Sequence, residues 1–448
     1  MNDVLKTLSY IEVLKMAQEY MSNFLFDTDD FNDEDIIKFK KNLKSFISEK
    51  QILCEGIDKI SDLVDKLYNS MVWYDCLTPY LEAEKINELG IEEIYGQWNC
   101  IFVVTKDKVM KIPEIFPSPE YAKNIINRIV RRSKKSNEVN EGTPISLGEF
   151  KMGVRYGAVG EPVCPANTGS AFAIRIVKAN DIDKDFIIEK KTATPEQAEF
   201  LLMCARFGAN ICFCGKVHSG KTGSMSFIIN ELKKDPLYRI GTVEHESREL
   251  NPFVYDKNGN VINNAFSWVT RPSTDKNQSV EATDLVATML RFSADLGAFG
   301  EMRGAETYAV VRAGNTGQSI IATTHANSAK SAYSSIVTLC KTAGIPFDDK
   351  TLYNMAIEAF PIIAYQHEST DQYGNKSRRI VEIAEGIEFK DGHVIMNPIY
   401  KYEIQKSTNV DGKQITDGSV KKVGTLSHDL KQRLLLNDCP SEKVEKYA

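Results

Sequence analysis

The chain has 448 residues, of which 42% are hydrophobic and 26% charged, and its net charge is −6. This length predicts two or three globular domains, and the acidic balance argues against a general nucleic-acid-binding role, which shows as a basic excess. We find no signal-peptide pattern, no apolar run of roughly 18 residues and no Cys-x-x-Cys pair, so we expect a reduced, cytoplasmic protein without a membrane span, zinc site or disulfide framework.

The first part of the chain predicts two small domains. Residues 1–90 carry apolar side chains at spacings of three and four with few Gly or Pro, which predicts a helical N-terminal domain. Between residues 91 and 180, short β-rich runs surround one helix that begins at Pro119, which predicts a compact α+β domain. The residues of these two domains show no catalytic motif by themselves.

The second part of the chain predicts a larger domain and a tail. Strand and helix patterns alternate over residues 192–405, which is typical of a doubly wound α/β core. The Thr-Pro-Glu-Gln segment at 194–197 predicts a helix that begins with a capping box. Residues 406–448 are polar and weakly patterned, so we expect a loosely held tail with one helix near 429–435.

The most specific motif is Gly-x-x-x-x-Gly-Lys-Thr, between an apolar run at 210–214 and a helical run at 224–232. This is the strand, loop and helix order of a phosphate-binding loop, in which backbone N–H groups converge on phosphate oxygens at the positive end of the helix. We expect Lys221 to reach the β- and γ-phosphates and Thr222 to bind Mg²⁺, and we predict that the chain binds a nucleoside triphosphate, ATP. The predicted nucleotide-binding residues are Gly215, Lys216, Val217, His218, Ser219, Gly220, Lys221, Thr222 and Gly223.

Three later segments end predicted strands in polar residues. The first ends in Glu244, the second in the Gly-Glu-Met-Arg-Gly stretch at 300–304, and the third in His325. A carboxylate at a strand end beside a phosphate loop can hold Mg²⁺ through water or polarise an attacking water. Taken alone, however, Glu244 is better interpreted as a solvated surface acid and His325 as a structural histidine.

Together with the loop, these segments resemble the secretion and pilus ATPases of type II secretion, type IV pili and conjugative type IV secretion, and the tight-adherence (Flp) pilus assembly ATPases look closest. The resemblance covers roughly residues 91–405. It implies an α/β fold in which a RecA-like P-loop core follows a small α+β, PAS-like domain, with the helical domain outside the resemblance. The residues that it implies in catalysis are Glu301 as general base, Glu244, His325 and Arg303, with Thr222, Glu244 and Glu301 around Mg²⁺, partly through water.

The same resemblance gives roles to four further arginines. Arg155 and Arg175 stand where the family places arginines that face the nucleotide, and a guanidinium binds phosphate oxygens in a fixed fork. Arg271 and Arg291 lie in segments that the family places near the nucleotide or the subunit boundary. The sequence departs from the family pattern at His245, where an Asp is usual, and at Gln318, where a His is common.

By this resemblance, the chain is expected to be a cytoplasmic Mg²⁺-dependent ATPase motor that forms a homo-oligomer, a hexamer in the family's manner. It would lie peripherally at the cytoplasmic membrane face, energising pilus assembly, protein secretion or conjugative transfer through inner-membrane platform or secretion-complex proteins. No direct sequence-specific nucleic-acid contact is expected. Two alternatives stay open: a nucleotide-switched scaffold that hydrolyses slowly or not at all, and a nucleic-acid ring motor.

Overall fold

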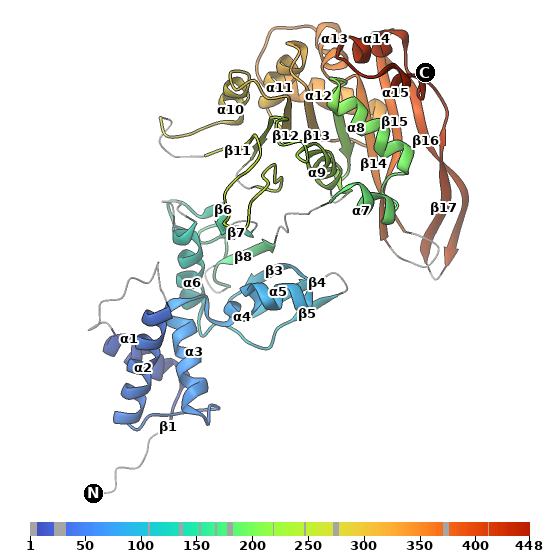
Figure 1. Cartoon of the computed structure of the whole chain (residues 1–448). Helices are drawn as coiled ribbons and strands as arrows, with labels where there is room; N and C mark the ends of the chain where they lie inside the picture. The colour runs from blue at the N-terminus through green and yellow to red at the C-terminus, as the bar shows by residue number, and fades with distance from the viewer. Residues whose placement is uncertain are drawn as a thin grey trace, which may run out of the picture. The chain divides into compact units, whose positions relative to one another are not determined.

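The structure is a computed structural model of the whole chain (Figure 1). It describes residues 7–21, 33–105, 108–133, 138–151, 154–165, 168–176, 182–217, 219–245, 248–271, 277–370, 376–410 and 412–448. The predicted site residue His218 lies outside these ranges. The chain divides into two compact units, Met1–Val177 and Lys178–Ala448, which are described separately below.

The first unit begins with a small helical bundle. Its elements are β1 (Thr7–Leu8), α1 (Tyr10–Met21), α2 (Asp33–Glu49), β2 (Leu53–Cys54) and α3 (Ile60–Val72). The apolar faces of the three helices meet in one core, in which Val13, Leu43 and Leu67 are fully buried. The amphipathic spacing of these sequences therefore produces the expected bundle.

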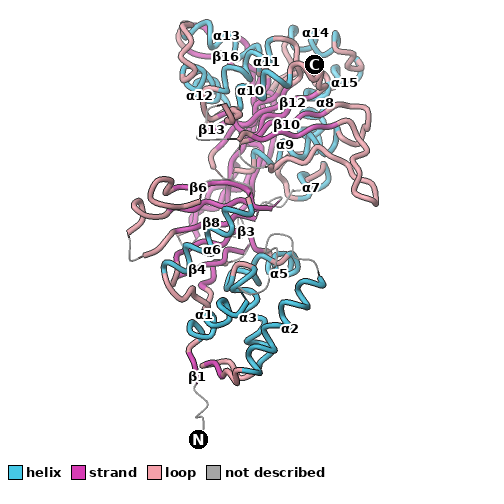
Figure 2. Tube along the Cα trace, turned by 90° about the vertical axis from the view of Figure 1, so that its left-hand side faces the viewer, coloured by secondary structure: helices cyan, strands magenta, loops and turns pink. Residues whose placement is uncertain are grey.

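A six-stranded antiparallel sheet follows in the order β5-β4-β3-β8-β7-β6. The elements of this part are η1 (Asp75–Leu77), α4 (Thr78–Leu81), α5 (Ala83–Leu89), β3 (Ile91–Gln97), β4 (Cys100–Thr105), β5 (Val109–Lys111), α6 (Pro119–Arg132), β6 (Ile145–Lys151), β7 (Val154–Val159) and β8 (Ala171–Ile176). One face of the sheet buries its alternate residues against α6, whose Ile125 and Ile129 lie in the shared core. The strands and helices appear along the tube in Figure 2.

The core of this sheet extends further back along the chain than residue 91. Tyr74, Leu77, Leu81 and Ile86 are buried with the sheet and α6, whereas the core of the helical bundle ends at Val72. The helical segment 74–89 thus belongs by its packing to the α+β part. This differs from the predicted boundary at residue 90, because helical spacing alone does not tell which core a helix packs against.

The second unit contains a nine-stranded sheet in the order β11-β10-β12-β13-β9-β14-β15-β16-β17. Its strands are β9 (Ile211–Gly215), β10 (Ile240–Glu244), β11 (Ala265–Val269), β12 (Leu296–Met302), β13 (Ile320–His325), β14 (Ile362–Thr370), β15 (Lys376–Lys390), β16 (His393–Val410) and β17 (Lys413–Lys422). The first six strands of this order are parallel, and the remaining pairs are antiparallel. In the parallel part, the carboxyl ends of all strands therefore meet at one edge.

Helices cover both faces of the parallel strands. They are α7 (Lys184–Glu189), α8 (Pro195–Arg206), α9 (Lys221–Leu232), α10 (Ala282–Met289), α11 (Glu306–Asn315), α12 (Ala329–Lys341), α13 (Asp349–Ala359), α14 (His428–Leu436) and α15 (Ser441–Glu445). One core joins α8, α9 and α14 to the sheet, and a second core joins α10 to α13 to the opposite face. The predicted α/β class, with a RecA-like core after a small α+β domain and a helical domain, is confirmed; the PAS-like comparison stays a prediction.

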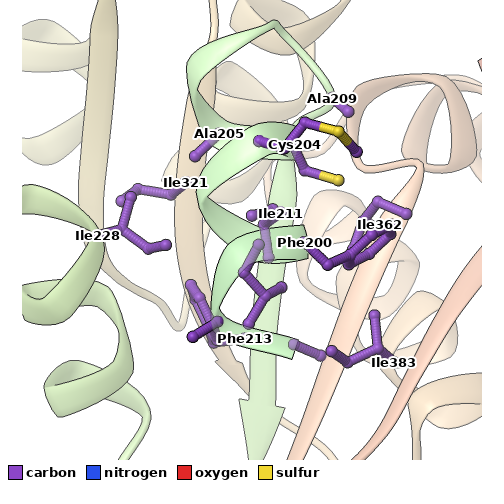
Figure 3. Packing of buried hydrophobic residues seen from close by; sticks show 14 of the residues in the cluster. Phe200, Cys204, Ala205, Ala209, Ile211, Phe213, Ile228, Ile321, Ile362 and Ile383 are labelled. Atoms are coloured by element: carbon purple, nitrogen blue, oxygen red, sulfur yellow. The ribbon is translucent and has the colours of Figure 1, made fainter. Parts of the chain in front are cut away.

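Strand β9 lies at the centre of this sandwich. Ile211 and Phe213 point into the core with α8, where Figure 3 shows them beside Phe200, and Cys212 and Cys214 point to the other face. Both thiols are free and fully buried, as expected for cysteines that act as small apolar side chains. The strand is fixed from both sides, so the loop that follows it starts from a rigid position.

Two local predictions can be compared with these elements. The capping box of α8 is confirmed, since the Thr194 side chain accepts from the backbone of Gln197 and the Gln197 side chain accepts from that of Thr194. The tail differs from the expectation: β16 and β17 form a long hairpin, and Leu430 and Leu434 of α14 are buried in the core. The two strands pair with each other through backbone hydrogen bonds, although their sequences show only a weak apolar pattern.

Candidate functional site

The predicted phosphate-binding loop joins β9 to α9, and close contacts and backbone conformation favour glycine at two of its positions. A Cβ on Gly215 would lie 2.3 Å from the carbonyl oxygen of Gln366 on the neighbouring strand β14. Gly220 has a φ of +95° as the residue before α9, a conformation that side chains disfavour. Ser219 is buried beneath the loop, and Lys216 and Val217 are exposed on it. Other residue types at the two glycine positions would open the loop.

Lys221 lies inside the loop and donates to it. Its Nζ is 3.2 Å from the carbonyl oxygen of Gly215 and 3.0 Å from that of Lys216, and the residue is only 8% exposed. Burial lowers the pKa of its ammonium group, and the nearby Glu301 carboxylate opposes this shift. Thr222 and Gly223 follow in the first turn of α9, both half-buried. The predicted phosphate-contacting lysine is thus held at the start of the helix.

Glu301 stands on an irregularity of strand β12. The register between β12 and β13 shifts between Phe299 and Met302, so Glu301 leaves the regular ladder at the carboxyl edge. The Thr323 hydroxyl of β13 donates to the carbonyl oxygen of Gly300 over 2.6 Å. Bulges of this kind redirect side chains beside functional sites, and here the bulge turns an acid toward the phosphate-binding loop.

His325, at the end of β13, connects Glu301 with Lys221. Its Nε2 is 2.6 Å from a carboxylate oxygen of Glu301, and its Nδ1 is 3.5 Å from Nζ of Lys221. A lysine ammonium only donates and a carboxylate only accepts, so both contacts are satisfied by an imidazole that carries its proton on Nε2. The structure therefore brings together three residues that the sequence placed in separate motifs.

Glu244, at the end of β10, is 3% exposed and binds the chain that follows it. One carboxylate oxygen accepts from the backbone N–H of Glu249 over 2.8 Å, and both oxygens lie within 3.3 Å of the N–H of Leu250. A Cβ on Gly300 would come within 3.0 Å of the Glu244 side chain, so the two strand ends are in close contact. Glu244 thus fixes the segment after β10, a contact that its sequence motif did not indicate.

Arg155 and Arg175 belong to the first unit, where they are direct neighbours across strands β7 and β8. Glu149 lies opposite Arg155, and Glu93 lies opposite Arg175, so four charged residues cross the sheet in one row. Cross-strand pairs of opposite charge stabilise a sheet and like pairs oppose it, so the two outer glutamates balance the arginine pair. The sequence named both arginines without indicating that they are adjacent.

The remaining three predicted arginines are exposed in the second unit, and two of them lie apart from Lys221. Arg271 follows β11 at the carboxyl edge, but β11 is four strands from β9, roughly 19 Å at ~4.8 Å per strand. Arg291 precedes β12 and so lies toward the amino edge, away from the phosphate-binding loop. Arg303 is close to Glu301 in sequence, and its backbone N–H donates to Glu306. Of these three, only Arg303 lies beside the converging residues.

Sequence reasoning missed two residues of β14 and β15 that support the loop. Gln366 is 1% exposed, and its Oε1 accepts from the Ser224 hydroxyl of α9 over 3.1 Å. The side chain of Arg378 lies against Gly220, within 3.1 Å of a Cβ placed there. Both residues are more than 140 positions from the loop, so a local motif cannot reveal them. The available sequence signal is that Gln366, a polar residue, directly follows a predicted buried apolar run.

Comparisons with known proteins add the following. Residues 145–360 match the family model described as type II/IV secretion system protein. The chain is 25% identical over 297 residues to the uncharacterized protein MJ0900 of Methanocaldococcus jannaschii, covering 65% of this chain and 48%, about half, of that relative. It is 22% identical over 403 residues to an uncharacterized protein of Bacillus anthracis, covering 87% of this chain and 82% of the relative. The solved structure of the Legionella pneumophila ATPase DotB is 17% identical with a TM-score of 0.48, covering 66% of this chain and 77% of that one.

Proposed function

Because residues 145–360 match the type II/IV secretion system protein family, we propose that the chain belongs to the type II/IV secretion ATPase superfamily and that the whole protein is a Mg²⁺-dependent ATPase motor. It would work as a homo-oligomer, a hexameric ring, that powers pilus assembly, protein secretion or conjugative transfer through a membrane complex. The observation that carries this proposal is the contact of Lys221, His325 and Glu301 beside the phosphate-binding loop.

The proposed chemistry is positioning combined with charge stabilisation. Lys221 would exchange its contacts with the loop carbonyls for phosphate oxygens of ATP. Glu301 would orient the attacking water and accept its proton as general base, and the Nε2–H of His325 would hold the Glu301 carboxylate in place. Arg303, exposed two residues after Glu301, would stabilise charge on the phosphates.

The donor set fits Mg²⁺. Within the described ranges, no group of three or more His, Cys, Asp or Glu side chains could hold a metal ion alone. Mg²⁺ is commonly bound by one or two protein oxygens together with substrate phosphates and water. The Thr222 hydroxyl would supply such an oxygen, and Glu244 and Glu301 would accept hydrogen bonds from water on the ion. When bound, the ion would neutralise charge on the phosphate oxygens.

Arg155 and Arg175 would sense the nucleotide in this proposal. Their adjacency across β7 and β8 gives a surface with two guanidinium groups side by side, which suits a phosphate with several charged oxygens. Arg271 and Arg291, exposed and apart from Lys221, would act at the boundary with another subunit.

The setting of the motor is also proposed. Within the described residues, no helix combines the length and apolar content needed to cross a bilayer. We place the protein in the cytoplasm, at the membrane face through inner-membrane platform or secretion-complex proteins, with the helical bundle as adaptor. The net charge of −6 supports a protein partner over sequence-specific nucleic acid.

The decisive test is Mg²⁺-dependent ATP turnover of the full chain, compared with Lys221→Ala and Glu301→Gln. We expect Lys221→Ala to abolish both nucleotide binding and turnover. Glu301→Gln should bind nucleotide normally and lose ~10²- to 10⁴-fold in kcat, since it removes a general base. Wild-type turnover equal to that of Lys221→Ala would instead favour the nucleotide-switched scaffold, and DNA-stimulated unwinding would favour the nucleic-acid motor.

A further inference from the structure

His245 connects the ends of two strands beside the candidate site. It follows Glu244 at the end of β10, and its Nε2 lies 3.2 Å from the main-chain oxygen of Glu301 on β12. The same Nε2 lies 3.5 Å from a carboxylate oxygen of Glu306, the first residue of α11. The side chains of His245 and Glu306 are 19% and 11% exposed, so both contacts are largely shielded from water. Both neighbours of Nε2 only accept hydrogen bonds, so this nitrogen carries a proton.

Glu306 in turn holds the turn that follows Glu301. The same carboxylate oxygen accepts from the backbone N–H of Arg303 over 2.7 Å and from that of Gly304 over 2.8 Å. A Cβ on Gly304 would lie 2.9 Å from the other oxygen, so the glycine leaves space for the carboxylate. Burial raises the pKa of Glu306, but hydrogen bonds from His245 and the backbone N–H groups outweigh it and lower the pKa to about 2.

The main chain around Glu301 is therefore fixed on both sides. His245 binds the carbonyl oxygen of Glu301 itself, and Glu306 binds the N–H groups two and three residues later. The Glu301 carboxylate projects from this fixed segment to His325. A carboxylate at position 245 could not donate to either acceptor and would stand beside the Glu306 carboxylate, so the histidine suits this neighbourhood.

We propose that His245 and Glu306 are positioning residues for ATP hydrolysis, which set the direction of the Glu301 carboxylate by fixing the peptide segment 301–304. This inference rests on the proposed ATPase function. Neither residue needs to contact ATP. A displacement of about 1 Å in a reacting group can lower the rate ~10²-fold. Loss of the His245 contact should therefore lower kcat.

The test compares His245→Ala with His245→Gln, whose amide can still donate a hydrogen bond near the position of Nε2. We expect His245→Ala to lower kcat ~30- to 100-fold while KM changes less than about threefold, and His245→Gln to recover most of the rate. Gly304→Ala should lower kcat in the same way, because its Cβ displaces the Glu306 carboxylate without altering either partner. His393→Ala is the matched control, since His393 is exposed at the start of β16.

Three results would overturn the inference: wild-type kcat in His245→Ala, a KM effect as large as the kcat effect, or His245→Gln no better than His245→Ala. Wild-type turnover no higher than that of Lys221→Ala would refute the proposed function instead. In that case, NMR of histidine-labelled full-length protein still tests the contact, because the signal lost in His245→Gln should report a proton on Nε2. A proton on Nδ1 alone would show that His245 does not donate to Glu301.

Discussion

The carboxylate of Glu306 makes the stability of the second unit depend on pH. Its pKa in the folded protein is about 2, below the ordinary value of 4.5, so the ionised form is favoured by folding. The resulting stabilisation is complete above about pH 4.5 and is lost as the pH falls toward 2. At 11% exposure of the side chain, this shift corresponds to roughly 3 kcal/mol in the free energy of unfolding.

We therefore expect Glu306→Gln to be less stable than the wild type by up to ~3 kcal/mol near neutral pH, with the difference shrinking toward zero near the folded pKa. Urea unfolding of both proteins over this pH range measures the difference directly. The other carboxylates change the free energy of unfolding of both proteins equally, so their contributions cancel in the difference. Parallel stability curves for the two proteins would show that Glu306 is not held as described.

A second prediction concerns Gly215, where the loop begins. A Cβ there would lie 2.3 Å from a backbone oxygen of β14, which cannot turn away as a side chain does. Gly215→Ala should therefore weaken nucleotide binding at least ~10-fold and destabilise the fold by ~1–3 kcal/mol. Gly142→Ala is the matched control, because Gly142 is exposed, lies outside the predicted nucleotide-binding residues, and its Cβ would meet only the Asn140 side chain at 3.4 Å. Equal binding by the two variants, measured by titration with labelled ADP, would contradict this account.

Among the elements, the pairing of β12 with β13 determines where Glu301 lies. Thr323 donates to Gly300 at the register shift, so its hydroxyl stabilises the bulge. We expect Thr323→Val to lose ~1–2 kcal/mol of stability and also to lower kcat, because the bulge and the proposed general base, Glu301, would shift together. Denaturant unfolding and steady-state turnover measure the two effects.

Thr307→Val is the control for this substitution. The Thr307 hydroxyl of α11 is buried and finds no hydrogen-bond partner in the described part of the chain. Its replacement by a methyl group of similar shape should be neutral or slightly stabilising. Equal losses in Thr323→Val and Thr307→Val would mean that packing, rather than the hydrogen bond to Gly300, causes the effect.

Regular elements were predictable from the sequence where the signal is local. The capping box of α8, the buried strand β9 and helix α14 each follow from a few adjacent residues. The hairpin β16–β17 was not predictable, because its exposed polar strands are defined by pairing with each other rather than by an apolar face. Likewise, Gly297 weakens the strand pattern of β12 for a tertiary reason: a Cβ there would lie 2.8 Å from the sulfur of Met289.

In the candidate site, too, some residues have a local sequence signal and others are defined only by tertiary contacts. Lys221, Glu301 and His325 were named from motifs, and their contact with one another needed only the shared carboxyl edge of a parallel sheet. Glu306 was not named, although it follows Glu301 by five residues. Its role depends on the partner His245 from another strand, and that pairing exists only in the folded chain.

At the scale of the molecule, helix α6 joins the two parts of the first unit. Arg128 donates to the carbonyl oxygens of Ser70 and Trp73, and Arg132 donates to that of Val72, so both arginines bind the end of α3. The guanidinium of Arg132 also lies over the ring of Trp73, 4.7 Å from its centre. These contacts attach the helical bundle to the sheet domain.

Truncation tests where the sheet domain begins. Removal of residues 1–72 leaves its core complete, whereas removal of residues 1–85 also deletes Tyr74, Leu77 and Leu81. Loss of a large buried side chain costs ~2–5 kcal/mol, so loss of three exceeds much of the ~5–15 kcal/mol that stabilises a typical domain. We expect the shorter deletion to unfold cooperatively on heating and the longer one to be susceptible to protease in its sheet domain. If the adaptor proposal holds, the protein without residues 1–72 should still hydrolyse ATP but no longer bind the membrane partner. If both truncated proteins fold equally well, the sheet domain begins near residue 90 instead.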